Sequence, residues 1–125
     1  MSFRVYDKKK KRWVNDNVYL TPNGDLLKSS QSAFGWTKLP PVSNGRYVYQ
    51  KSIDLYDKNN TLIYMGDYVK AQVAEDRVIT GLVTYAPELS AHIILCFDTD
   101  EYFTLGTEVC DFIEVVGNVF EEFKK

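Results

Sequence analysis

The chain comprises 125 residues with a mass of 14.4 kDa; 45% of the residues are hydrophobic, 14% aromatic and 26% charged, and the net charge is −2. This composition excludes a disordered chain, and the length allows one compact core or two very small lobes but no cofactor enzyme of ordinary design. No run of about 18 apolar residues is present and residues 1–6 carry no apolar signal core, so we expect a cytoplasmic protein without a membrane partner.

The charge is unevenly distributed along the chain. Residues 1–61 contain eleven Lys and Arg against five acids, a net charge of +6, whereas residues 62–125 contain four against twelve, a net charge of −8. This division predicts a boundary near residue 60 and two surfaces of opposite sign that attract each other within one chain or between chains. The alternative is an uneven scatter of solvated charge, because exposed ion pairs contribute little stability.

The predicted first lobe, residues 1–61, opens with hairpins. Residues 3–6 and 12–14 are rich in aromatic and β-branched side chains and are separated by a polar tip, which predicts one hairpin. Asn23-Gly24 then favours a second hairpin between residues 18–20 and 25–27, because these two residues adopt the positive φ angles of a tight turn.

Residues 28–46 are the predicted hinge loop, since Ser, Gly, Pro and Asn dominate this stretch. Phe34 and Trp36 lie within it, and we expect both to be buried against a neighbouring lobe or subunit. The chain extends again from residue 47 to residue 56 and turns at residues 57–60.

The predicted second lobe, residues 62–125, consists of short strands. Residues 68–73 and 78–85 are expected to form two adjacent antiparallel strands, with further strands near residues 93–97, 101–104 and 112–116. We interpret Gly81, inside the second of these strands, as a bulge or sharp bend. The pattern predicts a mainly β protein with an SH3-like small barrel, and the alternative is one antiparallel sheet curling over the N-terminal hairpins.

Residues able to drive catalysis or bind a metal are scarce. His92 and Cys96 are four residues apart on a strand, about 13 Å, which is too far for a nucleophile and its base. Asp98 and Asp100 begin like a calcium loop, but the sequence has Phe103 where that loop needs Gly. We therefore predict no enzyme activity, no metal and no cofactor, and interpret Cys96 and Cys110 as reduced core residues.

Two groups of residues are candidates for binding. Lys8, Lys9, Lys10, Lys11 and Arg12 concentrate positive charge suited to phosphate, and Trp13 is placed to stack on a base.

The second group is aromatic. The nine tyrosines and two tryptophans suit protein interfaces, because they bury large areas and keep one polar group; ordinary β propensity is the alternative reason for their number. Beside Phe34 and Trp36, the candidates are Tyr47 and Tyr49, which share one face of a strand.

Three blocks of sequence, in order along nearly the whole chain, resemble the YopX family of phage and prophage proteins. They are residues 3–8 (FRVYDK), 57–69 (DKNNTLIYMGDYV) and 114–121 (EVVGNVFE). The chain differs from the family pattern at Asn60, Met65 and Glu122. The resemblance implies a two-part β architecture with an SH3-type barrel in the second part and a tendency to form homo-oligomers, and it implies no enzymatic role.

The sequence as a whole predicts a non-enzymatic phage or prophage accessory protein. It is expected to act by homo-oligomerisation and by binding a protein, with a host protein as the possible target. The alternative is a nucleic-acid-binding protein that uses the basic tip from Lys8 to Arg12.

Overall fold

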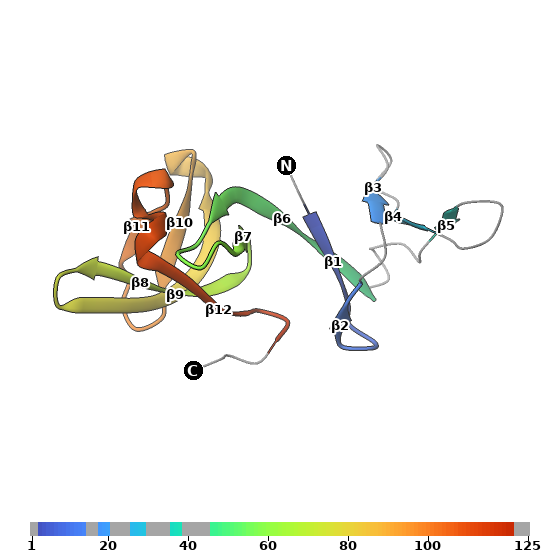
Figure 1. Ribbon diagram of the computed structural model, residues 1–125, viewed down its shortest axis with the longest axis horizontal. Helices are drawn as coiled ribbons and strands as arrows, with labels where there is room; N and C mark the ends of the chain where they lie inside the picture. The colour runs from blue at the N-terminus through green and yellow to red at the C-terminus, as the bar shows by residue number, and fades with distance from the viewer. Residues whose placement is uncertain (1–2, 15–17, 21–25, 30–35, 39–45, 122–125) are drawn as a thin grey trace. The chain divides into compact units, whose positions relative to one another are not determined.

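The computed structural model describes residues 3–14, 18–20, 26–29, 36–38 and 46–121. For 18–20, 26–29 and 36–38 it describes the backbone alone. The described chain is mainly β, as predicted (Figure 1). It divides into two compact units, an N-terminal unit, Phe3–Gln50, and a C-terminal unit that contains Lys51–Lys125.

A hairpin begins the N-terminal unit. Strands β1 (Phe3–Asp7) and β2 (Arg12–Trp13) pair antiparallel, with Tyr6 opposite Trp13, so the first predicted hairpin is confirmed. The carboxylate of Asp7 accepts hydrogen bonds from the backbone N–H groups of Lys9 and Lys10 at 3.0 and 3.2 Å, and Lys11 adopts a φ of 55°. Local bonds from one acid therefore hold the turn.

A second, three-stranded sheet lies in the same unit. Strands β3 (Val18–Leu20), β4 (Leu26–Ser29) and β5 (Trp36–Lys38) are antiparallel neighbours in that order. The pairing of β3 with β4 confirms the second hairpin, while its turn at Asn23-Gly24 lies outside the described residues. The predicted loop over residues 28–46 is wrong where it overlaps β4 and β5, because β4 pairs with β3 and β5 pairs with β4.

Strand β6 (Tyr47–Tyr56) contributes residues to both units, which divide between Gln50 and Lys51 rather than near residue 60. The turn after β6 explains why residues 51–61 belong with the C-terminal unit. Buried Asp57 accepts hydrogen bonds from the N–H groups of Thr61 at 2.8 Å and of Val115 at 2.9 Å. The sequence shows the turn but not this second bond, which joins positions 58 residues apart.

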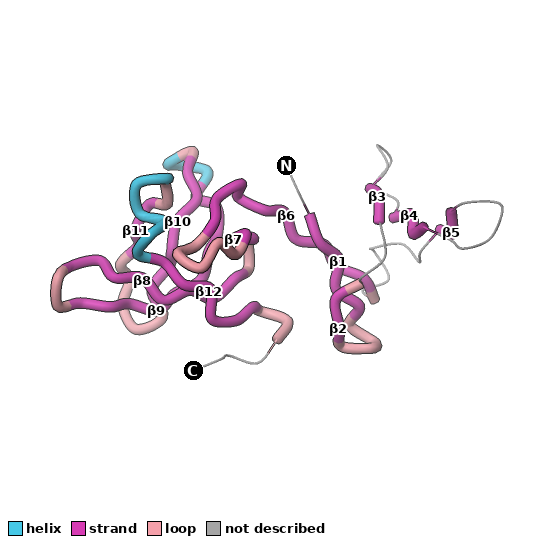
Figure 2. Tube along the Cα trace, viewed as in Figure 1, coloured by secondary structure: helices cyan, strands magenta, loops and turns pink. Residues whose placement is uncertain are grey.

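The C-terminal unit is a curled five-stranded antiparallel sheet, a half-barrel (Figure 1). Its strands are β8 (Asp67–Ala74), β9 (Arg77–Ala86), β10 (Ala91–Cys96), β11 (Tyr102–Thr104) and β12 (Ile113–Asn118). Their order in the sheet is β11-β10-β9-β8-β12, and the short strand β7 (Leu62–Tyr64) pairs with β6. The short 3₁₀ helices η2 (Pro87–Leu89) and η3 (Thr107–Phe112) also belong to this unit and are drawn in cyan in Figure 2. The SH3-like form of the barrel stays a prediction.

The core of the C-terminal unit lies on the inner face of this sheet. Alternation along the strands sends Val69, Val83 and Ile94 inward, each at most 2% exposed. Ile63 from β7 and Ile113 from β12 are equally buried in the same cluster. Cys96 is part of this core, as predicted, whereas Cys110 is half-buried in η3; neither is in a disulfide.

Gly81 does not mark a bulge. It pairs in continuous register with Val69 on one side and Cys96 on the other, and the shift in the β8–β9 ladder falls between Gln72 and Ala74. A Cβ at Gly81 would lie 2.5 Å from the carbonyl oxygen of Leu95, so the glycine permits a close approach of the β10 backbone.

Candidate functional site

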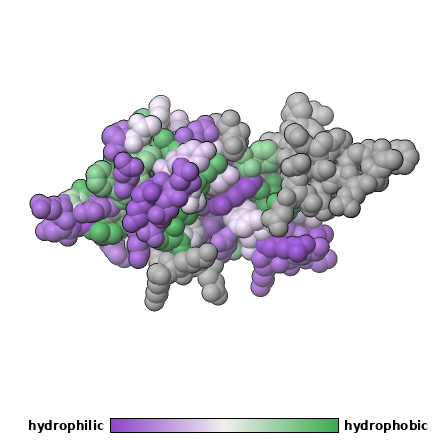
Figure 3. Space-filling model, in the orientation of Figure 1, coloured by the Kyte–Doolittle hydropathy of each residue, from purple (hydrophilic) through white to green (hydrophobic). Residues whose placement is uncertain are grey.

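The predicted basic tip is exposed at the end of the first hairpin. Lys8 to Arg12 are all exposed in the turn and the start of β2, and Figure 3 shows hydrophilic residues gathered over this tip. The adjacent Asp7 pairs with Arg46, with Nη2 and Oδ2 3.2 Å apart. The hydrogen bond from Arg46 and those from the backbone of Lys10 and Lys9 hold the pKa of Asp7 below its usual value. Asp7 is thus a fixed anion that secures the turn.

Trp13 already has aromatic and cationic neighbours. The guanidinium of Arg4 lies 3.9 Å from the centroid of the indole, and Tyr6 meets it edge-on with centroids 5.0 Å apart. Arg4 also donates a hydrogen bond to Oε1 of Gln50 at 3.2 Å. These contacts occupy part of the ring that was expected to stack on a base.

Of the aromatic candidates, the structure describes the surroundings of Tyr47 and Tyr49, which differ in exposure. Tyr47 is buried and lies 4.9 Å beneath the guanidinium of Arg46, whereas Tyr49 is partly exposed and contacts Phe3 edge-on. Phe34 lies outside the described residues, and the structure describes Trp36 only as the first residue of β5.

The residues considered for catalysis or metal binding are dispersed. His92 packs edge-to-face against Tyr85, with centroids 5.2 Å apart, while Cys96 belongs to the core. Asp98 and Asp100 lie in the exposed connection between β10 and β11, where Glu101 pairs with Arg77. Within the described ranges, no three His, Cys, Asp or Glu side chains are grouped as metal ligands.

An apolar row crosses the outer face of the five-stranded sheet. Direct cross-strand pairing places its members side by side: Tyr68 opposite Leu82, Leu82 opposite Leu95, and Leu95 opposite Tyr102. Phe97 joins the row edge-on to Tyr68, with ring centroids 5.2 Å apart. Leu95, Phe97 and Tyr102 are 42%, 50% and 50% exposed. Sequence reasoning missed this row because its members come from four segments.

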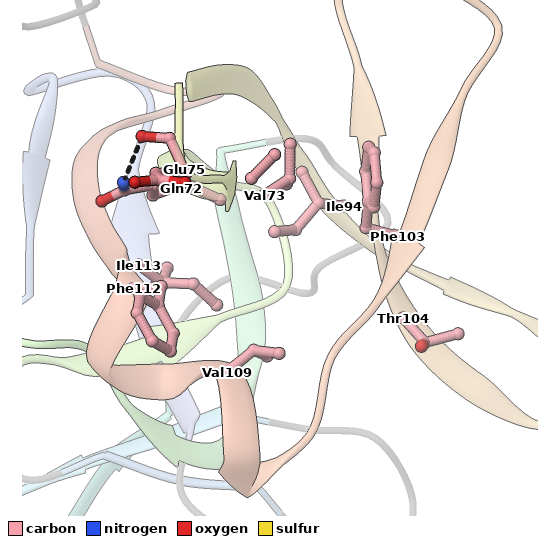
Figure 4. A pocket seen from close by; sticks show the side chains of 11 residues that line it. Gln72, Val73, Glu75, Ile94, Phe103, Thr104, Val109, Phe112 and Ile113 are labelled. Atoms are coloured by element: carbon pink, nitrogen blue, oxygen red, sulfur yellow. Dashed lines mark hydrogen bonds between the residues drawn. The ribbon is translucent and has the colours of Figure 1, made fainter. Parts of the chain in front are cut away.

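A cleft of about 540 Å³ opens on the inner side of the half-barrel. Figure 4 shows Val73, Ile94 and Phe103 on one side of it and Val109 and Phe112, from η3, on the other. It falls in the size range of pockets that hold small ligands or side chains. Strand alternation predicts that Val73 and Ile94 face inward. The cleft itself forms between these side chains and η3, and its presence therefore depends on where η3 is placed.

None of the helices in the described part of the chain has the length and apolar character needed to cross a membrane.

Comparisons with known proteins identify similar structures and the family of the chain. The structure is similar to the crystal structure of protein yopX from Bacillus subtilis, with a TM-score of 0.65 and 17% identity over 94% of this chain and 91% of that one. It is also similar to a crystal structure of a protein from Enterococcus faecalis, with a TM-score of 0.50 and 19% identity over 94% and 92% of the two chains. No curated protein matches the chain. The model of the YopX protein family matches residues 2–124, and the chain therefore belongs to the YopX family.

Proposed function

We propose that the protein acts without catalysis, by associating with copies of itself and by binding other proteins. The observation that carries the proposal is the apolar row, in which Leu95 of β10, Tyr102 of β11 and Phe97, directly after β10, are about half exposed. Contiguous exposed apolar surface of this kind is costly in water and is typical of binding sites. Aromatic members such as Phe97 and Tyr102 are the side chains that contribute most at protein interfaces.

The charges of the two units support association between copies. The N-terminal unit has nine Lys and Arg against three acids, and the C-terminal unit six against fourteen, so the net charges are +6 and −8. The structural division therefore preserves the imbalance counted along the sequence. Opposite net charges steer the basic unit of one copy toward the acidic unit of another and make association dependent on salt.

The proposal also includes the setting in which the protein acts. Resemblance to phage and prophage proteins supports a role as an accessory protein in the cytoplasm of a bacterial host, with a host protein as a second binding partner. An SH3-like barrel for the C-terminal unit belongs to the same proposal.

Replacing Leu95 with threonine is expected to weaken self-association about tenfold, because a central contact worth about 1.4 kcal/mol is lost while strand propensity is kept. Light scattering over a range of protein concentrations measures the change. Leu89→Thr is the matched control, since Leu89 has the same 42% exposure but lies in η2 and not in a strand of the apolar row. Equal weakening by both substitutions would count against the apolar row as the contact surface.

A nucleic-acid-binding function is the second candidate, favoured by the exposure of the five consecutive basic residues. For this function, changing Lys8, Lys9, Lys10 and Lys11 to serine is expected to reduce affinity for a single-stranded oligonucleotide and to flatten its dependence on salt. Fluorescence anisotropy at several salt concentrations provides both quantities. Binding that is insensitive to salt, or unchanged in the serine variant, contradicts this mechanism.

A further inference from the structure

The inner cleft of the C-terminal unit is an apolar site whose lining residues are not those of the apolar row. Val73, Ile94, Phe103, Val109 and Phe112 contribute side chains to it, and Phe112 is 54% exposed. Its volume of about 540 Å³ is enough for one or two large apolar side chains. The cleft belongs to one unit, because every lining residue lies between Ala71 and Ile113.

The surroundings of the cleft are acidic. Glu75 is part of the lining, and Asp76 follows it in the β8–β9 turn. In η3, exposed Glu108 and Asp111 are sequence neighbours of the lining residues Val109 and Phe112. No Lys or Arg is among the lining residues, and within the described part of the chain these four acids form no ion pair. A ligand with positive charge beside its apolar part is therefore favoured over a neutral or anionic one.

The acids of η3 also act on the thiol of Cys110 in the same helix. Burial is the main cause that raises the pKa of this thiol, and the negative charges of Asp111 and Glu108 raise it further. The same negative charges oppose nucleic acids and anionic lipid surfaces, whose phosphates would approach these carboxylates.

A strand edge next to the cleft, with which no further strand of the described residues pairs, favours a peptide as the occupant. Strand β11 is at the end of the sheet order. Backbone hydrogen bonds from Cys96 to Glu101 and from Leu105 to His92 show which residues of this segment face β10. By alternation, the N–H and C=O groups of Tyr102 and Thr104 point away from β10, and Thr104 also lines the cleft. An extended peptide can pair with such an edge.

We propose that the cleft binds an extended segment of a partner protein in which an apolar side chain is flanked by Lys or Arg. The apolar side chain fills the cleft, the peptide backbone pairs with the edge of β11, and the cations face Glu75 and the acids of η3. This inference rests on the proposed function in protein binding and specifies one site and the chemistry of its partner.

The probe is the acetylated and amidated hexapeptide Lys-Thr-Phe-Thr-Arg-Lys, titrated into the full chain and followed by NMR. We expect shift changes centred on Val73, Phe103 and Val109, and at least tenfold weaker binding of the acidic peptide Glu-Thr-Phe-Thr-Asp-Glu. A basic peptide with N-methylated backbone at both threonines is expected to bind several-fold more weakly, since it cannot pair with β11. Equal binding of the three peptides, or no shift changes at the cleft, overturns the proposal.

Variants of the protein test the contribution of charge and the contribution of the cleft's volume separately. Glu75→Lys is expected to weaken the basic peptide several-fold, whereas Glu88→Lys, which makes the same charge change at an exposed position in η2, is the matched control and is expected to leave affinity unchanged. Ala74→Phe places a larger side chain at the exposed margin of the cleft and is expected to block binding. Equal effects of the substitutions at Glu75 and Glu88 contradict a local site.

The outcome is distinguishable from that of the proposed self-association. A chain that stays monomeric in light scattering but binds the basic peptide at the cleft contradicts self-association and supports this inference. A chain that associates but gives no peptide shifts at the cleft supports the former and overturns the latter.

Discussion

Replacing Asp67 with alanine is expected to lower the free energy of unfolding of the C-terminal unit by about 3 kcal/mol, because it leaves one buried and one partly buried donor without this acceptor. Asp67 is 1% exposed. Its Oδ2 accepts the N–H of Tyr64 at 2.8 Å, and its Oδ1 accepts Nδ2 of Asn118, also at 2.8 Å. The carboxylate thus joins the end of β7, the start of β8 and the end of β12. Urea unfolding followed by circular dichroism measures the loss.

A double-mutant cycle with Asn118→Ala controls for simple loss of packing. The Asp67→Ala/Asn118→Ala variant is expected to be less destabilised than the sum of the single variants, because removing both partners leaves fewer groups unsatisfied. Strictly additive effects would contradict coupling through this bond. Asn118 also accepts the N–H of Phe120, so its own substitution is expected to have a separate cost.

Replacing Gly81 with alanine is expected to cost about 2–3 kcal/mol, near the upper end for overpacking a core. The added Cβ would lie 2.5 Å from the carbonyl oxygen of Leu95 and 2.6 Å from Cγ2 of Ile94. A backbone oxygen in a continuous ladder cannot move away without disturbing the pairing of β9 with β10. The same urea titration measures the effect.

Gly106→Ala is the matched control for this prediction. A Cβ there would meet the carboxylate of exposed Glu108 at 2.6 Å, and that flexible side chain can rotate away. We expect a change within about 0.5 kcal/mol, the range typical of surface substitutions. A loss at Gly81 no larger than at Gly106 would contradict the close approach of β10.

Local sequence patterns predicted the strands well because a hairpin depends on neighbouring residues. The alternation in residues 3–6 and the polar turn after it were enough to indicate β1 and β2. Gly81 shows the limit of local patterns. A glycine within a strand indicates that a side chain is disfavoured at that position, but it does not indicate why. Whether the backbone bulges or a neighbour approaches closely depends on β10, which follows after another turn.

Contacts between residues far apart in the sequence explain the other differences between the predictions and the structure. The unit boundary falls at residue 50 because Asp57 bonds to Val115, and charge counting cannot detect a bond between such distant positions. The apolar row and the cleft were missed for the same reason: both need the strand order, and the cleft also needs the position of η3. Counting aromatic residues indicated interfaces but selected Tyr47, which is buried, and not Tyr102.

The central claim is that copies of the chain associate through their surfaces. Light scattering of the full chain at increasing protein and salt concentrations tests this claim most directly. We predict a mass that rises above the 14.4 kDa of one chain as protein concentration increases and falls again as salt screens the opposite charges. A mass that remains at 14.4 kDa under all these conditions would contradict the claim of self-association.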